Sequence, residues 1–505
     1  MTRKQKLLLN STMSLTHQGI ALICGFILPR IFLITYGSAV NGLVASISQF
    51  LGFISFCELG VGAVVQSALY KPLAEKNAEE ISKITISAER FFRKIAYILL
   101  VYTIVLMLIL PLKTIDDFGY GYTLFLVVVM SISTFSQYYF GITYQLILAA
   151  DQLGFIHLSI HSITLILNTV TCAILVHFGA SIHFVKLITA LFFLVRPISL
   201  SFIAKRRYNI NRKIELKEEP IKQKWNGLAQ HIAAVVLNNT DVVVLTLFST
   251  LQNVSIYAVY NLIVGGVKEV VRSLTNGIQA LFGNMLAKRE IDQLNDSFDF
   301  FEWLMHTVVT LVFSATALLI LPFVSVYTIG VTDTNYIVPV FAYLLVIATA
   351  SYCLRLPYNI MVLAAGHYKQ TQCSAIIEAT LNIVISIVTV FKFGLIGVAL
   401  GTLIAMVYRT CYFAWYLSKN IINRNIGIFI KHLLVDAIVV SITVLAYNVR
   451  RSYFVLGDLT YIAWVILALK VCGLCFLASV LTNMVFYRKF LKKIAYGFFR
   501  KIVKK

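Results

Sequence analysis

Charged residues are scarce in this 505-residue chain, at 13% of the total, whereas a soluble domain carries about 25%. Hydrophobic residues make up 59%, so a water-soluble fold would have too little polar surface to cover its apolar side chains. The apolar residues occur in runs of about 20 or more, the length that crosses a hydrocarbon core of about 30 Å. The composition therefore excludes a soluble globular protein and predicts an all-α, polytopic membrane bundle.

The motifs of common enzyme classes are also missing. The chain has no P-loop, no G-x-S-x-G and no H-E-x-x-H sequence. The eight cysteines lie mostly within apolar runs, where cysteine acts as a small apolar packing residue. A membrane polymerase or ligase remains an alternative, but the longest predicted outer segments, 326–337 and 449–459, offer little room for an active site. We therefore expect a protein that is not an enzyme and needs no metal and no cofactor.

The apolar runs predict about fourteen transmembrane helices. They lie near residues 10–35, 42–69, 95–112, 121–149, 155–178, 184–203, 227–249, 255–283, 303–325, 338–365, 372–391, 396–417, 431–448 and 460–487. If the helices alternate from a cytosolic N-terminus, only Lys113, Lys392, Arg450 and Arg451 fall in outer loops. The positive-inside rule favours this orientation, with both termini in the cytosol. It also accounts for the net charge of +21 without a nucleic-acid partner.

An internal repeat suggests two lobes. Residues 144–170 and 358–384 share Ala-Ala and Leu-Asn steps, and Phe-Gly steps follow at 178–179 and 393–394. The offset spans six predicted helices, so the repeats are parallel, as in transporters that hold substrate between two halves. The expected parts are a six-helix lobe over 1–204, a cytosolic linker over 205–226, a second six-helix lobe over 227–418, two additional helices within 419–487 and a basic cytosolic tail over 488–505.

Several ionisable residues lie inside predicted helices, where each costs about 2.5–3.5 kcal/mol on insertion scales and normally faces a partner or a cavity. They are Arg30, Glu58, Asp241, Lys268, Glu269, Arg272, Arg355, Glu378, Arg409 and Lys470. Lys268 and Arg272 are four residues apart and share a helix face. With Arg30 and Arg355 they are candidates for a cationic cavity that binds phosphate, since Arg and Lys both suit phosphate oxygens.

Two alternatives stay open for these basic residues. Arg30 follows Pro29 in the outer half of its helix, where it could equally be an interfacial residue whose charge reaches the lipid headgroups. Glu269 could pair with Arg272 for packing alone.

Among the acidic residues, Glu58 and Asp241 are the candidates for binding a coupling proton or cation. Arg409 and Lys470 are expected to be structural or peripheral.

Three stretches carry a resemblance to a known family. Residues 28–77 read LPRIFLITYGSAVNGLVASISQFLGFISFCELGVGAVVQSALYKPLAEKN, residues 238–266 read NNTDVVVLTLFSTLQNVSIYAVYNLIVGG, and residues 278–287 read IQALFGNMLA. They resemble bacterial polysaccharide-unit flippases of the Wzx type, in the multidrug/oligosaccharidyl-lipid/polysaccharide exporter superfamily. The resemblance covers residues 1 to about 420 and extends loosely over the last two helices.

The resemblance implies a two-lobed bundle of twelve or fourteen helices in the bacterial cell membrane. It implies that the substrate is an undecaprenyl-diphosphate-linked oligosaccharide, moved to the outer leaflet for capsule or exopolysaccharide synthesis by alternating access and coupled to an ion gradient. Arg30 and the Lys268/Arg272 face are the positions here that fit contact with the pyrophosphate. Expected partners are membrane lipids and the polymerase and glycosyltransferases of the same pathway.

Two rival transport functions have the same predicted fold. A lipid II flippase handles a similar lipid diphosphate and is hard to separate by sequence. An exporter of cationic drugs needs an acidic or aromatic cavity, which the basic residues of the predicted helix 255–283 argue against.

The predicted orientation can be tested by cysteine labelling in a cysteine-free background. A membrane-impermeant reagent added outside intact cells should label a cysteine placed within residues 113–120 and should not label one placed within 205–225. The reverse pattern would overturn the orientation.

Overall fold

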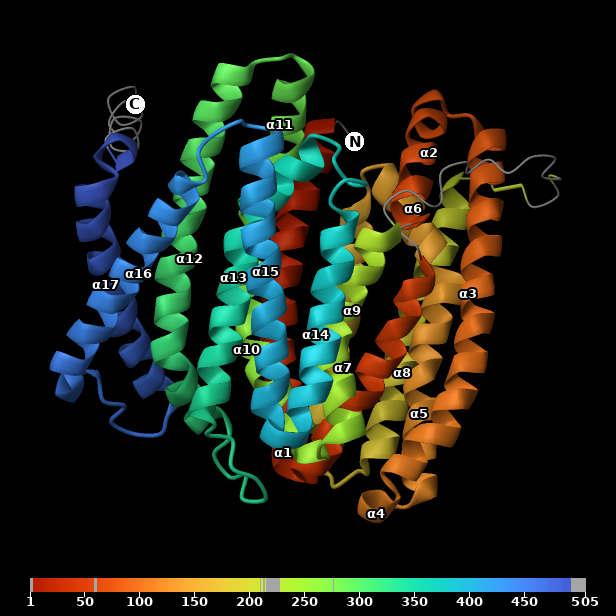
Figure 1. The fold of residues 1–505 in the computed structure, drawn as a ribbon. Helices are drawn as coiled ribbons and strands as arrows, with labels where there is room; N and C mark the ends of the chain where they lie inside the picture. Colours follow the sequence, from red (N-terminus) through yellow and green to blue (C-terminus); the bar gives the residue numbers. More distant parts are fainter. Residues whose placement is uncertain are drawn as a thin grey trace. The chain divides into compact units, whose positions relative to one another are not determined.

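The computed structural model describes residues 3–58, 61–208, 210–211, 214, 228–275 and 277–491. Over these residues twelve helical segments are long and apolar enough to cross a membrane. The helical membrane bundle expected from composition is therefore confirmed (Figure 1).

Two features explain why twelve segments correspond to about fourteen predicted crossings. The first helix, α1 (Arg3–Gly52), contains 50 residues and breaks at Gly37, where φ is 83°. At 1.5 Å per residue, 50 residues span about 75 Å, roughly twice the hydrocarbon thickness. The break at Gly37 therefore separates two crossings. The helix α9 (Leu228–Phe248) supplies a further apolar helix of 21 residues.

The chain divides into two compact units, 1–258 and 259–505. The first contains α1, η1 (Phe53–Glu58), α2 (Val61–Glu75), α3 (Ala78–Lys113), α4 (Ile115–Phe118), α5 (Tyr120–Ser136), η2 (Gln137–Gly141), α6 (Ile142–Ala150), α7 (Gly154–His177), α8 (Ile182–Tyr208) and α9. The helix α10 (Leu251–Ser273) crosses the boundary. The second contains α11 (Ile278–Ala287), α12 (Ile291–Tyr327), α13 (Pro339–Ala364), α14 (Gln372–Phe393), α15 (Leu395–Asn420), α16 (Gly427–Val449), η3 (Arg451–Phe454) and α17 (Tyr461–Phe486).

The contacts of α9 and of the start of α10 explain why the first unit extends to residue 258. Asn41 of α1 donates to Ser255 of α10 at 2.7 Å, and the hydroxyls of Ser46 and Thr246 are also 2.7 Å apart. The backbone of Leu251 lies against Gly42, where it occupies the space that a Cβ atom would need. The division into six-helix lobes at residues 204 and 227 stays a prediction from the repeat. Most of the predicted linker and tail lies outside the described residues.

Two helices begin earlier than the apolar runs indicate. The sequence predicts starts at 95 and 303, whereas α3 begins at Ala78 and α12 at Ile291. The side chain of Asn77 caps α3 by accepting from the backbone N–H of Glu80 at 3.1 Å. Each added segment is polar on one face and apolar on the other, so a search for continuous hydrophobic runs misses it.

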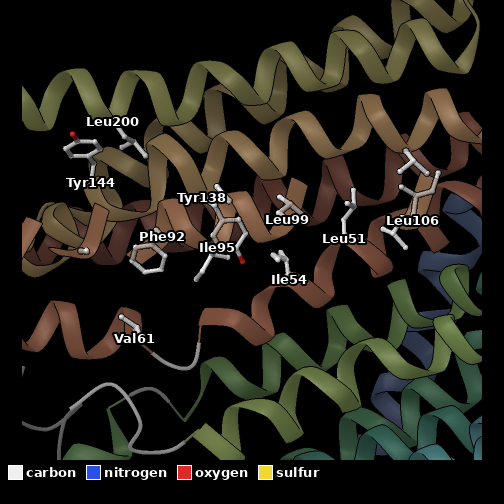
Figure 2. Packing of buried hydrophobic residues seen from close by; sticks show 14 of the residues in the cluster. Leu51, Ile54, Val61, Phe92, Ile95, Leu99, Leu106, Tyr138, Tyr144 and Leu200 are labelled. Atoms are coloured by element: carbon white, nitrogen blue, oxygen red, sulfur yellow. The ribbon is translucent and has the colours of Figure 1, made fainter. Parts of the chain in front are cut away.

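The predicted helix over 42–69 is interrupted. The chain forms a short 3₁₀ segment, η1, after α1 and resumes as α2 at Val61. Figure 2 shows Ile54 of η1 beside Tyr138 of η2 and Ile95 of α3 in the apolar core of the first unit. The interruption therefore lies inside the protein core, where backbone that departs from the α-helix is tolerated at membrane depth.

Residues shared by the repeat occupy similar helix positions in the two units. Gly179 follows the end of α7 and Gly394 the end of α14, and both have positive φ, 75° and 52°. Asn168 of α7 and Asn382 of α14 are both buried. A glycine at positive φ is a standard helix end. The Gly and Asn matches therefore correspond to common structural roles.

Small residues allow α14 and α15 to pack closely. A Cβ atom at Gly401 would collide with Ser386 Oγ and lie 2.8 Å from the Ser386 backbone nitrogen. Near this contact the amide of Asn382 donates to Thr402 Oγ1 at 3.0 Å. Helices in lipid associate through such close packing and interhelical hydrogen bonds.

We predict that Gly401→Ala destabilises the protein because the added methyl group forces α15 away from α14. The expected loss is about 1–3 kcal/mol, typical of overpacking, measured as a lower thermal unfolding midpoint in detergent. Gly473→Ala is the matched control, since no atom lies within 4 Å of the space for its Cβ. An equal effect of both substitutions would contradict the close approach.

Candidate functional site

A cavity of about 380 Å³ lies within the first unit. Segments α1, η1, α5, η2 and α8 line it with residues Ser48, Leu51, Gly52, Ile54, Ser55, Met130, Ser133, Thr134, Tyr138, Lys186, Thr189, Ala190 and Phe193. Five of these side chains are serine or threonine, and Lys186 carries the only formal charge in this set. Hydroxyl groups together with one cation suit an anionic, oxygen-rich ligand.

The charge of Lys186 is held within the membrane-spanning part of α8. Its Nζ lies 4.6 Å from the centroid of the Phe32 ring, a distance at which a cation is attracted to an aromatic face. An ionisable side chain in a membrane-spanning helix is a functional candidate by default. Sequence reasoning missed Lys186 because it lies close to the start of the predicted helix 184–203. There a lysine is expected to extend its charge toward the interface.

Glu58 lies next to this cavity. The Tyr138 hydroxyl, on a residue that lines the cavity, donates to Glu58 Oε1 at 2.5 Å. Asp241 of α9 has a similar arrangement, since the Tyr257 hydroxyl donates to Asp241 Oδ2 at 2.9 Å. Both carboxylates predicted as ion-coupling residues therefore accept a tyrosine hydrogen bond.

A second cluster, which we call the α13–α15 basic cluster, consists of Lys268, Arg355, Glu378 and Arg409 with Tyr352. Arg355 of α13 and Arg409 of α15 both form ion pairs with Glu378 of α14. The side chain of Glu378 is fully buried, with 0% exposed. One carboxylate thus serves two guanidinium groups, which leaves an excess of positive charge inside the second unit.

Two of the basic residues predicted from sequence meet at Tyr352. Arg355 Cζ lies 4.8 Å and Lys268 Nζ 5.5 Å from the centroid of that ring. Lys268 therefore adds a further positive charge to the α13–α15 basic cluster. A cation within about 6 Å of an aromatic ring is attracted to the ring's electron-rich face, so Tyr352 stabilises both charges.

The other predicted residues lie in different surroundings. Arg272 is exposed and forms an ion pair with Glu269 at 3.5 Å, as the alternative reading of the sequence expected. Arg30 lies half-buried in α1, in the first unit. Arg409 was expected to be structural or peripheral, and it is not peripheral, since only 7% of its side chain is exposed and it forms an ion pair with Glu378. The sequence could not reveal this, because its partner Glu378 lies 31 residues away on another helix.

No group of three or more His, Cys, Asp or Glu side chains among the described residues is arranged to hold a metal ion. Cys472 and Cys475 have the C-x-x-C spacing but are free thiols within α17, the first exposed and the second buried.

Comparison with solved structures identifies the fold. The chain superposes on a structure described as "Lipid II flippase MurJ, inward closed conformation" with a TM-score of 0.70 and 16% identity, over 96% of this chain and 100% of that one. The fold resembles that of a lipid II flippase. An inward-facing multidrug resistance MATE family transporter of the MOP superfamily aligns with a TM-score of 0.53 and 12% identity, over 79% of this chain and 95% of that one.

Sequence comparisons add no family assignment. No protein-family model matches the chain, and no curated protein sequence matches it. At 12–16% identity the structural likeness establishes the fold, and function must be argued from the residues.

We predict that Glu378→Gln is strongly destabilising because it leaves two buried guanidinium groups without a counter-charge. Breaking a buried ion pair from one side costs about 3–5 kcal/mol. Glu269→Gln is the matched control, because the Glu269 side chain is 48% exposed and an exposed pair is worth about 0–1 kcal/mol. Chemical unfolding of the purified variants in detergent measures both. A small loss for Glu378→Gln would show that the α13–α15 basic cluster is not a stabilising element.

Proposed function

We propose that the protein is a flippase that moves an undecaprenyl-diphosphate-linked oligosaccharide from the inner to the outer leaflet of a bacterial cell membrane. The observation that carries the proposal is the positive charge inside each unit, of Lys186 in the first and of Lys268 and Arg355 in the second. The fold, which is similar to that of a lipid II flippase structure over 96% of this chain, agrees with it. The multidrug transporter aligns over a smaller share, 79%. The extent of the likeness is a statement about the fold, and the choice of a lipid-linked substrate rests on the charges described next.

The charges inside each unit support an anionic substrate. Lys186 lies among hydroxyl side chains in the first unit, and Lys268 and Arg355 meet at Tyr352 in the second. A cationic drug would be repelled by these groups, whereas a diphosphate would be attracted. We include Arg30, Lys268, Arg272 and Arg355 as the proposed contacts of the diphosphate and add Lys186 to them.

The proposed cycle is alternating access driven by an ion gradient, with Glu58 and Asp241 as candidate coupling residues. The pathway would be capsule or exopolysaccharide synthesis, with the glycosyltransferases that build the lipid-linked unit and the polymerase that consumes it as partners. Both termini are placed in the cytosol, since that orientation follows the positive-inside rule.

Substitution of Lys186 tests the proposal. In proteoliposomes, Lys186→Ala should reduce the initial rate of flipping of an undecaprenyl-diphosphate oligosaccharide by about tenfold or more. The reason is that a hydrogen bond to a charged group contributes about 1.5–3 kcal/mol. Lys186→Arg should retain more activity than Lys186→Ala because the positive charge is kept.

Lys470→Ala is the matched control. Lys470 also lies in a membrane-spanning helix and also contacts an aromatic ring, at 4.2 Å from the centroid of Tyr453, but it does not line the cavity. A wild-type rate for Lys186→Ala would remove Lys186 from the substrate path. Transport of lipid II or of a cationic dye in preference to the oligosaccharide lipid would favour the corresponding rival function.

A further inference from the structure

A buried polar network joins α12 and α13 to α16 in the second unit. His306 Nδ1 of α12 lies 2.6 Å from Asp436 Oδ2 of α16, and His306 Nε2 lies 2.9 Å from the Tyr358 hydroxyl of α13. The Tyr358 hydroxyl donates to Glu302 Oε1 at 2.7 Å. We call Glu302, His306, Tyr358, Arg424 and Asp436 the α12–α16 polar network. None of it is used in the function proposed above.

Arg424 keeps Glu302 ionised. Its Nη1 donates to Glu302 Oε2 at 2.6 Å and its Nη2 to Oε1 at 2.5 Å, and Nη1 also donates to Asp299 at 3.0 Å. Burial works to lower the pKa of Arg424, but the hydrogen bonds and charge of Glu302 outweigh it and raise that pKa. An ionised carboxylate can only accept hydrogen bonds. Tyr358 must therefore be the donor in its contact with Glu302.

The direction of that bond determines what His306 must do. A hydroxyl group has one hydrogen, and the hydrogen of Tyr358 points to Glu302. Toward His306 the Tyr358 oxygen can only accept, so Nε2 must carry a hydrogen. The contact between Nδ1 and Asp436 Oδ2 at 2.6 Å also needs a hydrogen between the two atoms. The network thus needs one proton more than a neutral imidazole and an ionised carboxylate supply.

We propose that His306 and Asp436 together form a site that binds one proton and couples it to the packing of α16 against α12 and α13. The proton is held either as an imidazolium beside a carboxylate or as a neutral imidazole that accepts from a carboxylic acid. Both forms satisfy every contact of the pair. His306 has 2% and Asp436 15% of its side chain exposed, so Asp436 is the more accessible member of the pair.

Loss of the proton breaks one contact of the network in either remaining arrangement. If Nε2 keeps its hydrogen, Nδ1 and the Asp436 carboxylate face each other as two acceptors across 2.6 Å. If Nδ1 keeps its hydrogen, Tyr358 must turn its own hydrogen to Nε2, and Glu302 loses that donor. The first case weakens the contact of α12 with α16, and the second weakens that of α12 with α13.

The remaining groups that face the pair do not supply the missing hydrogen. His432 of α16 stacks on His306 with 4.8 Å between ring centroids, and its Nε2 lies 3.7 Å from Glu302 Oε2, beyond hydrogen-bond distance. Its Nδ1 lies 2.7 Å from the Tyr487 hydroxyl, which follows α17. The segment α11, IQALFGNMLA, contains no titratable side chain. Glu58 and Asp241, the carboxylates proposed for ion coupling, differ from the His306–Asp436 pair in that their contacts need no extra proton. Each accepts the hydrogen of a tyrosine hydroxyl, which an ionised carboxylate can do.

The extra proton predicts a particular dependence of stability on pH. An unfolded histidine is neutral above about pH 6.5, whereas the proposed site needs one proton for its contacts in the folded state. The folded state then binds one proton more, so its stability must fall as pH rises. One proton corresponds to about a tenfold loss in the folded-to-unfolded ratio per pH unit until the site empties.

Asp436→Asn removes this requirement while it keeps the contacts. The amide can donate to Nδ1 of a neutral His306, whose Nε2 hydrogen still reaches Tyr358. In thermal unfolding of the detergent-purified, full-length protein from pH 5 to pH 9, the unfolding midpoint should therefore decline less for Asp436→Asn than for wild type.

Tyr358→Phe provides a second test, because without the tyrosine oxygen a neutral His306 can donate to Asp436 through Nδ1. Its unfolding midpoint should also decline less than that of wild type.

His367→Asn is the matched control. His367 Nδ1 also lies 2.9 Å from a tyrosine hydroxyl, that of Tyr416, in the same unit, but it belongs to a different network. This variant should keep the wild-type decline. The proposal is overturned if wild type, Asp436→Asn and Tyr358→Phe lose stability equally between pH 6.5 and pH 9.

A transport measurement extends the proposal and rests on the flippase function proposed above. An imposed proton gradient should accelerate flipping by Asp436→Asn less than it accelerates flipping by wild-type protein. Equal acceleration of both would show that this proton is not the coupling ion. If no lipid-linked substrate is moved at all, the proposed function fails, while the pH-dependent unfolding still decides whether the proton site exists.

Discussion

The burial of charge in apolar surroundings is the constraint on which this structure depends. The two buried ion pairs of Glu378 with Arg355 and Arg409 connect three consecutive helices, α13, α14 and α15. A charge left alone at this depth would be very costly, whereas a paired and hydrogen-bonded charge is tolerated. The same requirement accounts for the Glu302–Arg424 pair, which connects α12 to the segment before α16. Charges thus specify which helices of the second unit are neighbours, a specificity that lipid-like apolar surfaces cannot provide.

Positive charge exceeds negative charge in two groups of side chains, one in each unit. Lys186 faces a cavity lined by hydroxyl groups, and Lys268 and Arg355 share the ring of Tyr352. Glu378 neutralises only one of the two guanidinium groups that it contacts. A protein that needed these residues only for packing would be expected to balance them, since unbalanced buried charge is destabilising. The imbalance is therefore the best physical reason to assign the protein an anionic substrate.

Within the second unit, the two proposals use different residues. The anion would be attracted by the α13–α15 basic cluster, whereas the proton would be held in the α12–α16 polar network. The helix α13 belongs to both, because Arg355 and Tyr358 lie three residues apart on it. Residues at that spacing lie on neighbouring parts of a helix surface. Any change in α13 that follows proton release would therefore also move the side chain of Arg355.

The sequence by itself determined the class of fold and the approximate number of crossings, because hydrophobic length is a local property that a run of residues carries alone. It also located Lys268 and Arg355 as intramembrane charges, since a charge in an apolar run is visible without a structure. The partners of these residues were not visible. Glu378 and Arg409 meet across helices, and His306 meets Asp436 over a separation of 130 residues. The early starts of α3 and α12 were missed because amphipathic segments leave no continuous apolar run. Only the tertiary structure decided which of these charges form ion pairs with one another. Ion pairs depend on contacts between helices, and the pattern of residues along a single helix does not encode those contacts.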